Sequence, residues 1–160
     1  MIKMIILMFT VSISFSLTVK AEDNFSLKGT LLEPPKCGFN GGLQTLVEFG
    51  NRVGVNKVDG INYKQKIPYL MFCEAESKPW DMAFILTGIT TSYDGAAIQT
   101  NIDDLGIRLL INGKPFSVGK LVPIDFSKPP LLEAVPVKRP GSTLTAGAFE
   151  AVATIGINYQ

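Results

Sequence analysis

The stretch GAFEAVATIGINYQ, residues 147–160, ends the chain and decides the fold. Its alternate positions share one parity and carry apolar or aromatic side chains: Phe149, Ala151, Ala153, Ile155, Ile157 and Tyr159. In an extended chain these side chains lie on one face, so the stretch predicts a long strand with that face in a core. A last strand of this length needs backbone partners on both edges, or it leaves one edge open as a template for another chain.

The beginning of the chain has the features of an export signal. Lys3 supplies a positive charge, residues 4–19 are largely apolar, and Val19-Lys20-Ala21 has the small-x-small pattern of a cleavage site. We predict that residues 1–21 are a signal peptide. A retained membrane anchor is the alternative, but the apolar run is about 16 residues long, short of the roughly 20 that span a bilayer.

The composition of the 160 residues, 46% hydrophobic and 18% charged, is that of one globular domain. Cleavage after Ala21 would leave 139 residues and would remove two of the 15 basic residues, which leaves 13 against 14 acidic ones. A net charge near −1 argues against nucleic acid or an anionic membrane as partner.

Cys37 and Cys73 are an even pair in an exported chain and predict a single structural disulfide. A reactive or metal-binding pair is the alternative.

Residues 24–32 predict a strand at the start of the mature chain. Phe25, Leu27, Gly29 and Leu31 alternate with polar residues, which is the pattern of a strand with one apolar face. Glu33-Pro34-Pro35 follows at once, and two prolines remove two backbone donors. This strand therefore cannot continue into the one that Cys37 begins, and we interpret it as a detachable arm.

The rest of the chain predicts short strands separated by turns. We expect strands at residues 43–49, 64–73, 80–89, 106–111 paired with 114–118, and 131–137, turns at 38–42, 93–95 and 139–142, and a Pro-rich connection at 123–130. The apolar run at 80–89 indicates a central strand, and Asn112-Gly113 indicates a type I′ hairpin. Helical periodicity is missing after the signal peptide. The pattern predicts an all-β sandwich of Greek-key or immunoglobulin-like type.

Catalytic chemistry finds little support in this composition. The chain has no histidine, the commonest general base and metal ligand. Asp103 with Asp104, and Glu74 with Glu76, are carboxylate pairs that we interpret as solvated loop charges rather than as a hydrolase pair. Trp80, Tyr63, Tyr69 and Tyr93 would suit a sugar site, but aromatic residues near strands more often belong to the core. We therefore expect no enzyme, no catalytic residues, no metal and no cofactor.

The two ends of the chain together resemble the subunits of chaperone–usher fimbriae, most closely minor pilins of the P and type 1 kinds. In that family the last strand has a glycine fourteenth from the end and a tyrosine next to last, as Gly147 and Tyr159 are here. The family's N-terminal extension is an alternating apolar strand with a glycine, followed by proline and the first cysteine. Residues 25–37 have that order, and the spacing of Cys37 and Cys73 suits the family's single disulfide.

The resemblance implies an incomplete immunoglobulin-like Greek-key sandwich that lacks its final strand. Residues 22–35 would be the donor-strand extension, with Phe25, Leu27, Gly29 and Leu31 on the inserted face, and residues 36–160 would be the pilin domain. The groove would lie beside the strand that carries Gly147, Phe149, Ala151, Ala153, Ile155, Ile157 and Tyr159. A periplasmic chaperone fills this groove in the family, and the arm of the next subunit replaces it at the outer-membrane usher.

The function that follows from the resemblance is that of a structural subunit in an extracellular fimbrium on the bacterial surface. The resemblance to minor pilins implies a minor or adaptor role that supports cell adhesion. A two-domain tip adhesin is disfavoured, because 139 residues leave no room for an additional receptor-binding domain. Neighbouring pilins would be the partners, and no small-molecule substrate is expected. The alternative is a self-contained secreted β-sandwich that binds a carbohydrate or protein ligand through its loops.

Overall fold

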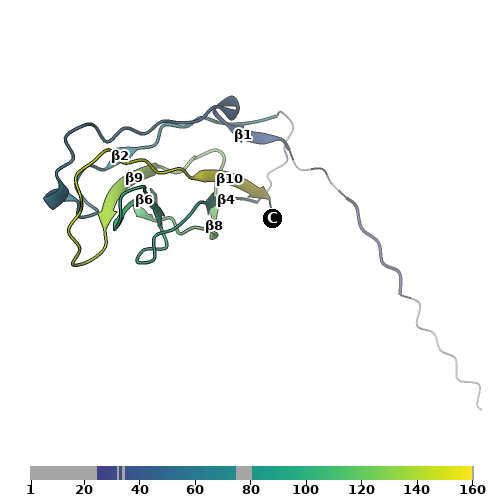
Figure 1. The fold of residues 1–160 in the computed structure, drawn as a ribbon. Helices are drawn as coiled ribbons and strands as arrows, with labels where there is room; N and C mark the ends of the chain where they lie inside the picture. The colour runs from purple at the N-terminus through teal and green to yellow at the C-terminus, as the bar shows by residue number, and fades with distance from the viewer. Residues whose placement is uncertain (1–24, 32, 34, 75–80, 160) are drawn as a thin grey trace, which may run out of the picture. The chain divides into compact units, whose positions relative to one another are not determined.

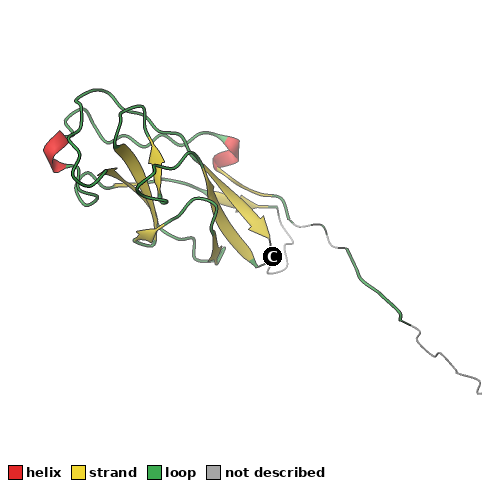
Figure 2. Cartoon of the chain, turned by 60° about the horizontal axis from the view of Figure 1, so that its bottom comes forward, coloured by secondary structure: helices red, strands yellow, loops and turns green. Residues whose placement is uncertain are grey.

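The computed structural model describes residues 25–31, 33, 35–74 and 81–159. The chain divides into two units, Met1–Leu32 and Glu33–Gln160, and the strands of the described residues all belong to the second. They form three sheets, and the only helical elements among the described residues are short 3-10 turns at Asn40–Gly42 and Val55–Lys57. Figure 2 shows this dominance of strands and loops. The all-β prediction is therefore confirmed, whereas the expected signal peptide, residues 1–21, lies outside the described residues.

The larger sheet is built around two long antiparallel strands, β6 (Leu105–Ile111) and β9 (Leu132–Lys138). They pair over seven positions, from Leu105 opposite Lys138 to Ile111 opposite Leu132. The sheet order is β2 (Gln65–Lys66), β9, β6, β5 (Ala97–Gln99), and β7 (Lys114–Pro115) also pairs with β6. The Asn112-Gly113 turn between β6 and β7 has φ values of 50° and 75°, which confirms the predicted hairpin.

The smaller sheet has β4 (Met82–Thr87) between β10 (Thr154–Tyr159) and β8 (Leu121–Ile124). The predicted central position of the 80–89 run is confirmed, and the buried Phe84 and Leu86 lie on its core face. Residues 123–130 were expected to form a Pro-rich connection, and for Pro123 and Ile124 this expectation is wrong, because they belong to β8. β8 is an edge strand, which pairs with β4 on one side. Pro123 lacks an N–H, and proline is tolerated in an edge strand because one side of the strand has no ladder to complete.

The third sheet joins β1 (Cys37–Phe39) to β3 (Met71–Cys73). Cys37 lies directly opposite Cys73, and the two form the predicted disulfide. The turn expected at residues 38–42 begins later, because Gly38 and Phe39 pair with Phe72 and Met71. The single strand expected at 64–73 is two strands in different sheets, since β2 pairs with β9 and β3 pairs with β1.

The core lies between the two larger sheets, which face each other as the layers of a sandwich (Figure 1). Phe84 and Leu86 of the smaller sheet pack with Leu109, Ile111 and Leu132 of the larger one, and Ile98 and Phe116 belong to the same cluster. Phe84 also makes an edge-to-face contact with Phe39, with ring centroids 5.2 Å apart. This contact ties β1 to the sandwich.

Two predicted strands are wrong or shortened. Residues 43–49 form no strand, and the last strand begins at Thr154 rather than near Gly147. The register of β10 with β4 explains the second difference. β4 ends at Thr87, opposite Thr154, so residues 147–153 run beyond the strand that would pair with them. An extended segment without a hydrogen-bonded neighbour is not a strand, even where its side chains alternate.

Candidate functional site: a groove between two unpaired backbones

Two extended segments of the second unit lie on either side of one groove, residues 44–53 and residues 143–153. Within the described part of the chain, neither segment donates or accepts a backbone-to-backbone hydrogen bond. Both run along the same side of the sandwich in Figure 1, the first in blue and the second in yellow leading into β10. Exposed backbone of this length without a ladder is what an edge strand offers to another chain.

The side chains along both segments alternate as they would in a strand. Thr45, Val47 and Phe49 are half-buried and their neighbours are exposed, and Phe149 and Ala151 repeat this pattern on the other side. The period of two shows that each segment directs one face into the molecule although no strand pairs with it. The alternating pattern at residues 43–49 therefore predicted correctly which side chains point into the molecule. It predicted wrongly that the segment pairs as a strand.

The groove includes a hollow where its walls bring two aromatic rings together. Phe49 and Phe149 have ring centroids 5.9 Å apart, and the surrounding hollow has a volume of about 980 Å³. Its lining includes Leu46, Val58 and Leu144, and Val58 and Leu144 are buried with Leu105 in a small apolar cluster. A cavity with such walls suits apolar side chains of a bound segment.

Beyond this hollow, the chain from Ala151 to β10 runs over the main core. Ala151, Ile155 and Ile157 pack against the core cluster that contains Phe84 but stay only half-buried, and so do Phe39 and Met71 of β1 and β3. Core residues of a finished sandwich are usually sealed from water. Here the apolar face of β10 is left partly open on one side.

The residues predicted for the groove strand therefore behave in two ways. Phe149, Ala151, Ile155, Ile157 and Tyr159 are half-buried, whereas Gly147 and Ala153 are exposed. Phe149 packs against the small apolar cluster, while Ala151, Ile155 and Ile157 pack against the main core. The opposite wall, residues 44–53 with Val58, was not assigned to the groove from the sequence. Its signal was present in the alternation of residues 43–49, but sequence alone does not show which two segments face each other.

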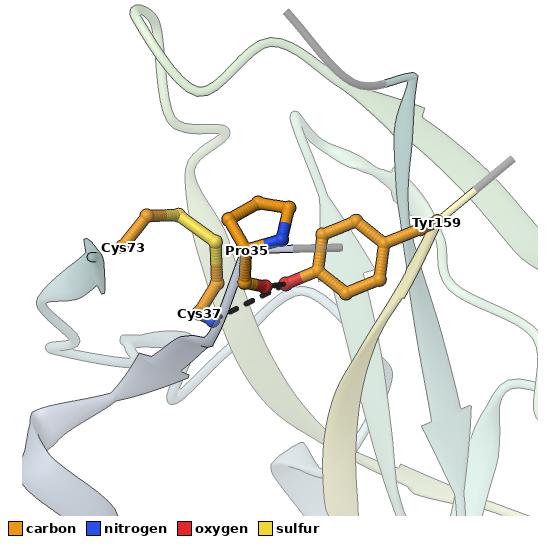
Figure 3. Close-up of a disulfide and its surroundings, with 4 residues drawn as sticks. All are labelled: Pro35, Cys37, Cys73 and Tyr159. Carbon is orange, nitrogen blue, oxygen red and sulfur yellow. Dashed lines mark hydrogen bonds between the residues drawn. A yellow bond between two sulfur atoms is a disulfide. The ribbon is translucent and has the colours of Figure 1, made fainter. Parts of the chain in front are cut away.

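Tyr159 lies at the end of β10, and Figure 3 shows its ring reaching toward β1. Its hydroxyl donates a hydrogen bond to the Pro35 carbonyl at 2.7 Å and accepts one from the Cys37 N–H at 3.2 Å. The disulfide from Cys37 to Cys73 lies beside these bonds. The end of β10 and the start of β1 are thereby held at a fixed separation.

The arm of the first unit is described for residues 25–31 and forms no strand by itself. The side chains of Phe25, Leu27 and Leu31 are exposed by 88% or more, which is unusual for three apolar residues with the same parity. A Cβ atom placed on Gly29 would meet no atom within 4 Å. Nothing in the chain's own structure therefore requires glycine at this position.

The other candidate side chains have structural partners. Asp104 forms an ion pair with Arg139, with 2.5 Å between Oδ1 and Nε, and Arg139 also lies over the ring of Tyr93. Tyr69 packs edge-to-face against Phe84 and donates a hydrogen bond to the Pro130 carbonyl. Tyr63 accepts one from the Gly54 N–H. Trp80 and Glu76 lie outside the described residues, while Asp103 and Glu74 are exposed.

In the described ranges no three His, Cys, Asp or Glu side chains gather as metal ligands would. The same ranges contain no helix that is both long and apolar enough to cross a membrane.

An all-β sandwich with one disulfide and open sheets is the fold of pilus subunits. The P pilus adaptor subunit PapF matches 80% of this chain and 98% of its own, with a TM-score of 0.58 and 21% identity. The P pilus rod subunit PapA matches 86% of this chain and 100% of its own, with a TM-score of 0.62 and 20% identity. These likenesses concern the fold.

Sequence comparison shows the family. The model described as fimbrial protein matches residues 25–160. The fimbrial-like protein YfcQ of Escherichia coli K12 is 33% identical over 153 residues, which cover 92% of this chain and 94% of YfcQ. YfcR of the same strain is 39% identical over 132 residues, covering 79% of this chain and 75% of YfcR. The chain belongs to the fimbrial protein family.

Proposed function

We propose that this protein is a structural subunit of a chaperone–usher pilus, assembled by donor-strand exchange. Its groove accepts a strand from one neighbouring subunit, and its arm enters the groove of another. The observation that supports this proposal most directly is the pair of unpaired backbone segments, 44–53 and 143–153, on the two sides of one apolar groove. A single inserted strand would satisfy both edges at once and complete the sandwich.

The arm has the properties that an inserted strand needs. The exposed side chains of Phe25, Leu27 and Leu31 would each contribute about 1.5–3 kcal/mol on full burial. Nine residues at roughly 3.3 Å each span about 30 Å, the length of a sandwich. Gly29 leaves room at one position on the same face, where the accepting groove would be shallow.

We further propose that a periplasmic pilus chaperone occupies the groove before assembly, and that an outer-membrane usher exchanges it for the arm of the next subunit. Residues 1–21 would direct export, and the finished fibre would lie on the outside of the cell. A minor or adaptor position would suit the arm, which would let the fibre continue beyond this subunit, and it agrees with the likeness to the adaptor PapF.

The assembly step can be tested with one change in the arm. Gly29→Leu leaves this subunit's own fold undisturbed, because a side chain at that position meets open space. In a neighbour's groove the same side chain would clash. We expect the oxidised mature chain to polymerise on concentration, and the Gly29→Leu chain to remain monomeric, as measured by size-exclusion chromatography with light scattering.

The matched control is Thr30→Leu, which adds a leucine to the opposite face of the arm and should polymerise like the unaltered chain. Normal polymerisation of the Gly29→Leu chain would contradict the role given to the arm.

For the chaperone, removal of Tyr159 and Gln160 should reduce recovery of a periplasmic partner bound to the tagged chain. Unchanged recovery would count against groove capture.

A further inference from the structure

Residues 147–150 lie past the end of β4, and the Asn101 side chain hydrogen-bonds their backbone where a neighbouring strand would otherwise do so. The Asn101 carboxamide donates through Nδ2 to the Ala148 carbonyl at 3.2 Å. Its Oδ1 accepts from the Glu150 N–H at 2.8 Å. These are the carbonyl and the N–H that a neighbouring strand would bind, because residues 148 and 150 of an extended chain direct their backbone groups to the same edge.

The loop that carries Asn101 is itself held firmly. Thr100 is buried, and its hydroxyl lies 3.1 Å from the Ile102 carbonyl and 3.0 Å from the Leu105 carbonyl. The same oxygen accepts a hydrogen bond from the Ile102 N–H at 3.1 Å. Ile102 then reaches the backbone at Gly147, where a Cβ would lie 3.7 Å from its Cδ1 atom. Asn101 is therefore presented to residues 148–150 from a rigid support.

The opposite edge of the same segment faces the groove. Phe149 lies between the two residues that Asn101 binds, so its N–H and carbonyl point away from Asn101. Its ring packs against Phe49 of the other wall. Asn101 thus keeps the backbone extended from behind while the edge that an incoming strand would pair with stays open.

We infer that Asn101 is a positioning residue for strand acceptance. By taking the place of a missing neighbour strand, it keeps residues 148–150 ready to pair, so that an incoming strand does not have to order them first. The inference rests on the proposed function, because it concerns the rate at which the same groove accepts a strand. A residue that only stabilises its own loop would affect the melting temperature and leave that rate unchanged.

The test uses the oxidised mature chain and a fluorescent peptide with the sequence of residues 24–33. Association is followed by anisotropy under conditions where the chain is folded and monomeric. We expect Asn101→Ala to slow association by about tenfold, the effect of losing two modest hydrogen bonds before binding. Asn101→Asp keeps the acceptor for the Glu150 N–H and loses the donor to the Ala148 carbonyl. Its association rate should therefore lie between those of the unaltered chain and Asn101→Ala.

Asp103→Ala is the matched control, because Asp103 is an exposed residue of the same loop, and its association rate should equal that of the unaltered chain. Equal rates for the unaltered chain and both Asn101 variants would overturn the inference and leave the proposed function standing. Equal slowing by Asp103→Ala would also overturn it, since the effect would then belong to the loop. Absence of peptide binding to the unaltered chain would instead contradict the proposed function. Should Asn101→Ala fail to fold, Asn101→Asp decides alone.

Discussion

The Tyr159 hydroxyl is bound on two sides by the backbone of the facing segment, 2.7 Å from the Pro35 oxygen and 3.2 Å from the Cys37 nitrogen. Tyr159 is next to last in the chain, and Pro35 and Cys37 stand at the start of the sandwich. The end of β10 and the start of β1 are therefore connected here, while residues 44–53 and 143–153 have no backbone-to-backbone hydrogen bond among the described residues.

Tyr159→Phe removes the hydroxyl and keeps the ring. We expect the oxidised mature chain, bound to the arm peptide, to lose about 1–2 kcal/mol of unfolding free energy, because two backbone groups lose a partner. Urea unfolding followed by circular dichroism measures this loss. Tyr63→Phe is the control, since it removes a hydroxyl bound to the Gly54 N–H in an exposed loop and should cost less. Identical losses for the two variants would contradict the role given to Tyr159.

Gly106→Ala should destabilise the larger sheet. A Cβ at Gly106 would lie 2.6 Å from Cγ2 of Thr91, which is too close for a real contact, and 3.1 Å from Cβ of Ala97, which is tight. Because β6 is paired with β5 and β9 on its two sides, the backbone cannot easily move away, and we expect a cost of about 1–3 kcal/mol. Gly95→Ala, where a Cβ meets open space, should change the urea midpoint little. A Gly106→Ala midpoint equal to that of Gly95→Ala would show that the strand is looser than described.

Alkaline pH should weaken the fold through Tyr69. Burial raises the pKa of Tyr69 above its ordinary value of 10.0, so the folded chain keeps the phenol neutral where the unfolded chain has already ionised it. The contribution to stability is complete below the unfolded pKa and is lost as pH rises through the folded pKa. The melting temperature should therefore fall more steeply between about pH 9 and pH 11 for the unaltered chain than for Tyr69→Phe. Parallel curves would contradict this.

The disulfide should matter more than any single hydrogen bond. Cys37 and Cys73 are 36 positions apart, and closing a loop of this length is worth about 4 kcal/mol in the chain-entropy model. The double variant Cys37→Ala, Cys73→Ala should lose an amount of this order in urea unfolding. Reduction of the unaltered chain should give a similar value. A loss below about 1 kcal/mol would mean that β1 and β3 hold together without the bond.

Much of the fold follows from local patterns in the sequence. The apolar run at 80–89 indicated a central strand, and Asn112-Gly113 indicated the hairpin, because burial and positive φ leave clear marks on residue choice. β8 was not predicted because it contains Pro123. Proline usually indicates a loop, and the sequence does not show that this position lies in an edge strand, where proline is tolerated. The strand expected at 64–73 was divided because its two ends pair in different sheets, which no local pattern records.

The candidate site was predicted only in part. The parity of Phe149, Ala151 and Ile155 indicated which side chains of the last segment point into the molecule, and the resemblance at the two ends supplied the idea of a missing strand. The second wall, residues 44–53, and the support from Asn101 depend on contacts between segments far apart in the chain. Asn101 contacts residues 47 and 49 positions away, and an isolated asparagine in a loop carries no sign of such a partner.

The central claim is that the groove edge of residues 149–153 lacks a backbone partner until a strand enters. Amide hydrogen exchange, resolved by residue in the oxidised mature chain with and without the arm peptide, tests it directly. The N–H groups of Phe149, Ala151 and Ala153 should exchange rapidly in the free chain and become strongly protected with the peptide, while those of β6 are protected in both. Protection of the same three amides in the free, monomeric chain, or no gain when the peptide is bound, would contradict the account.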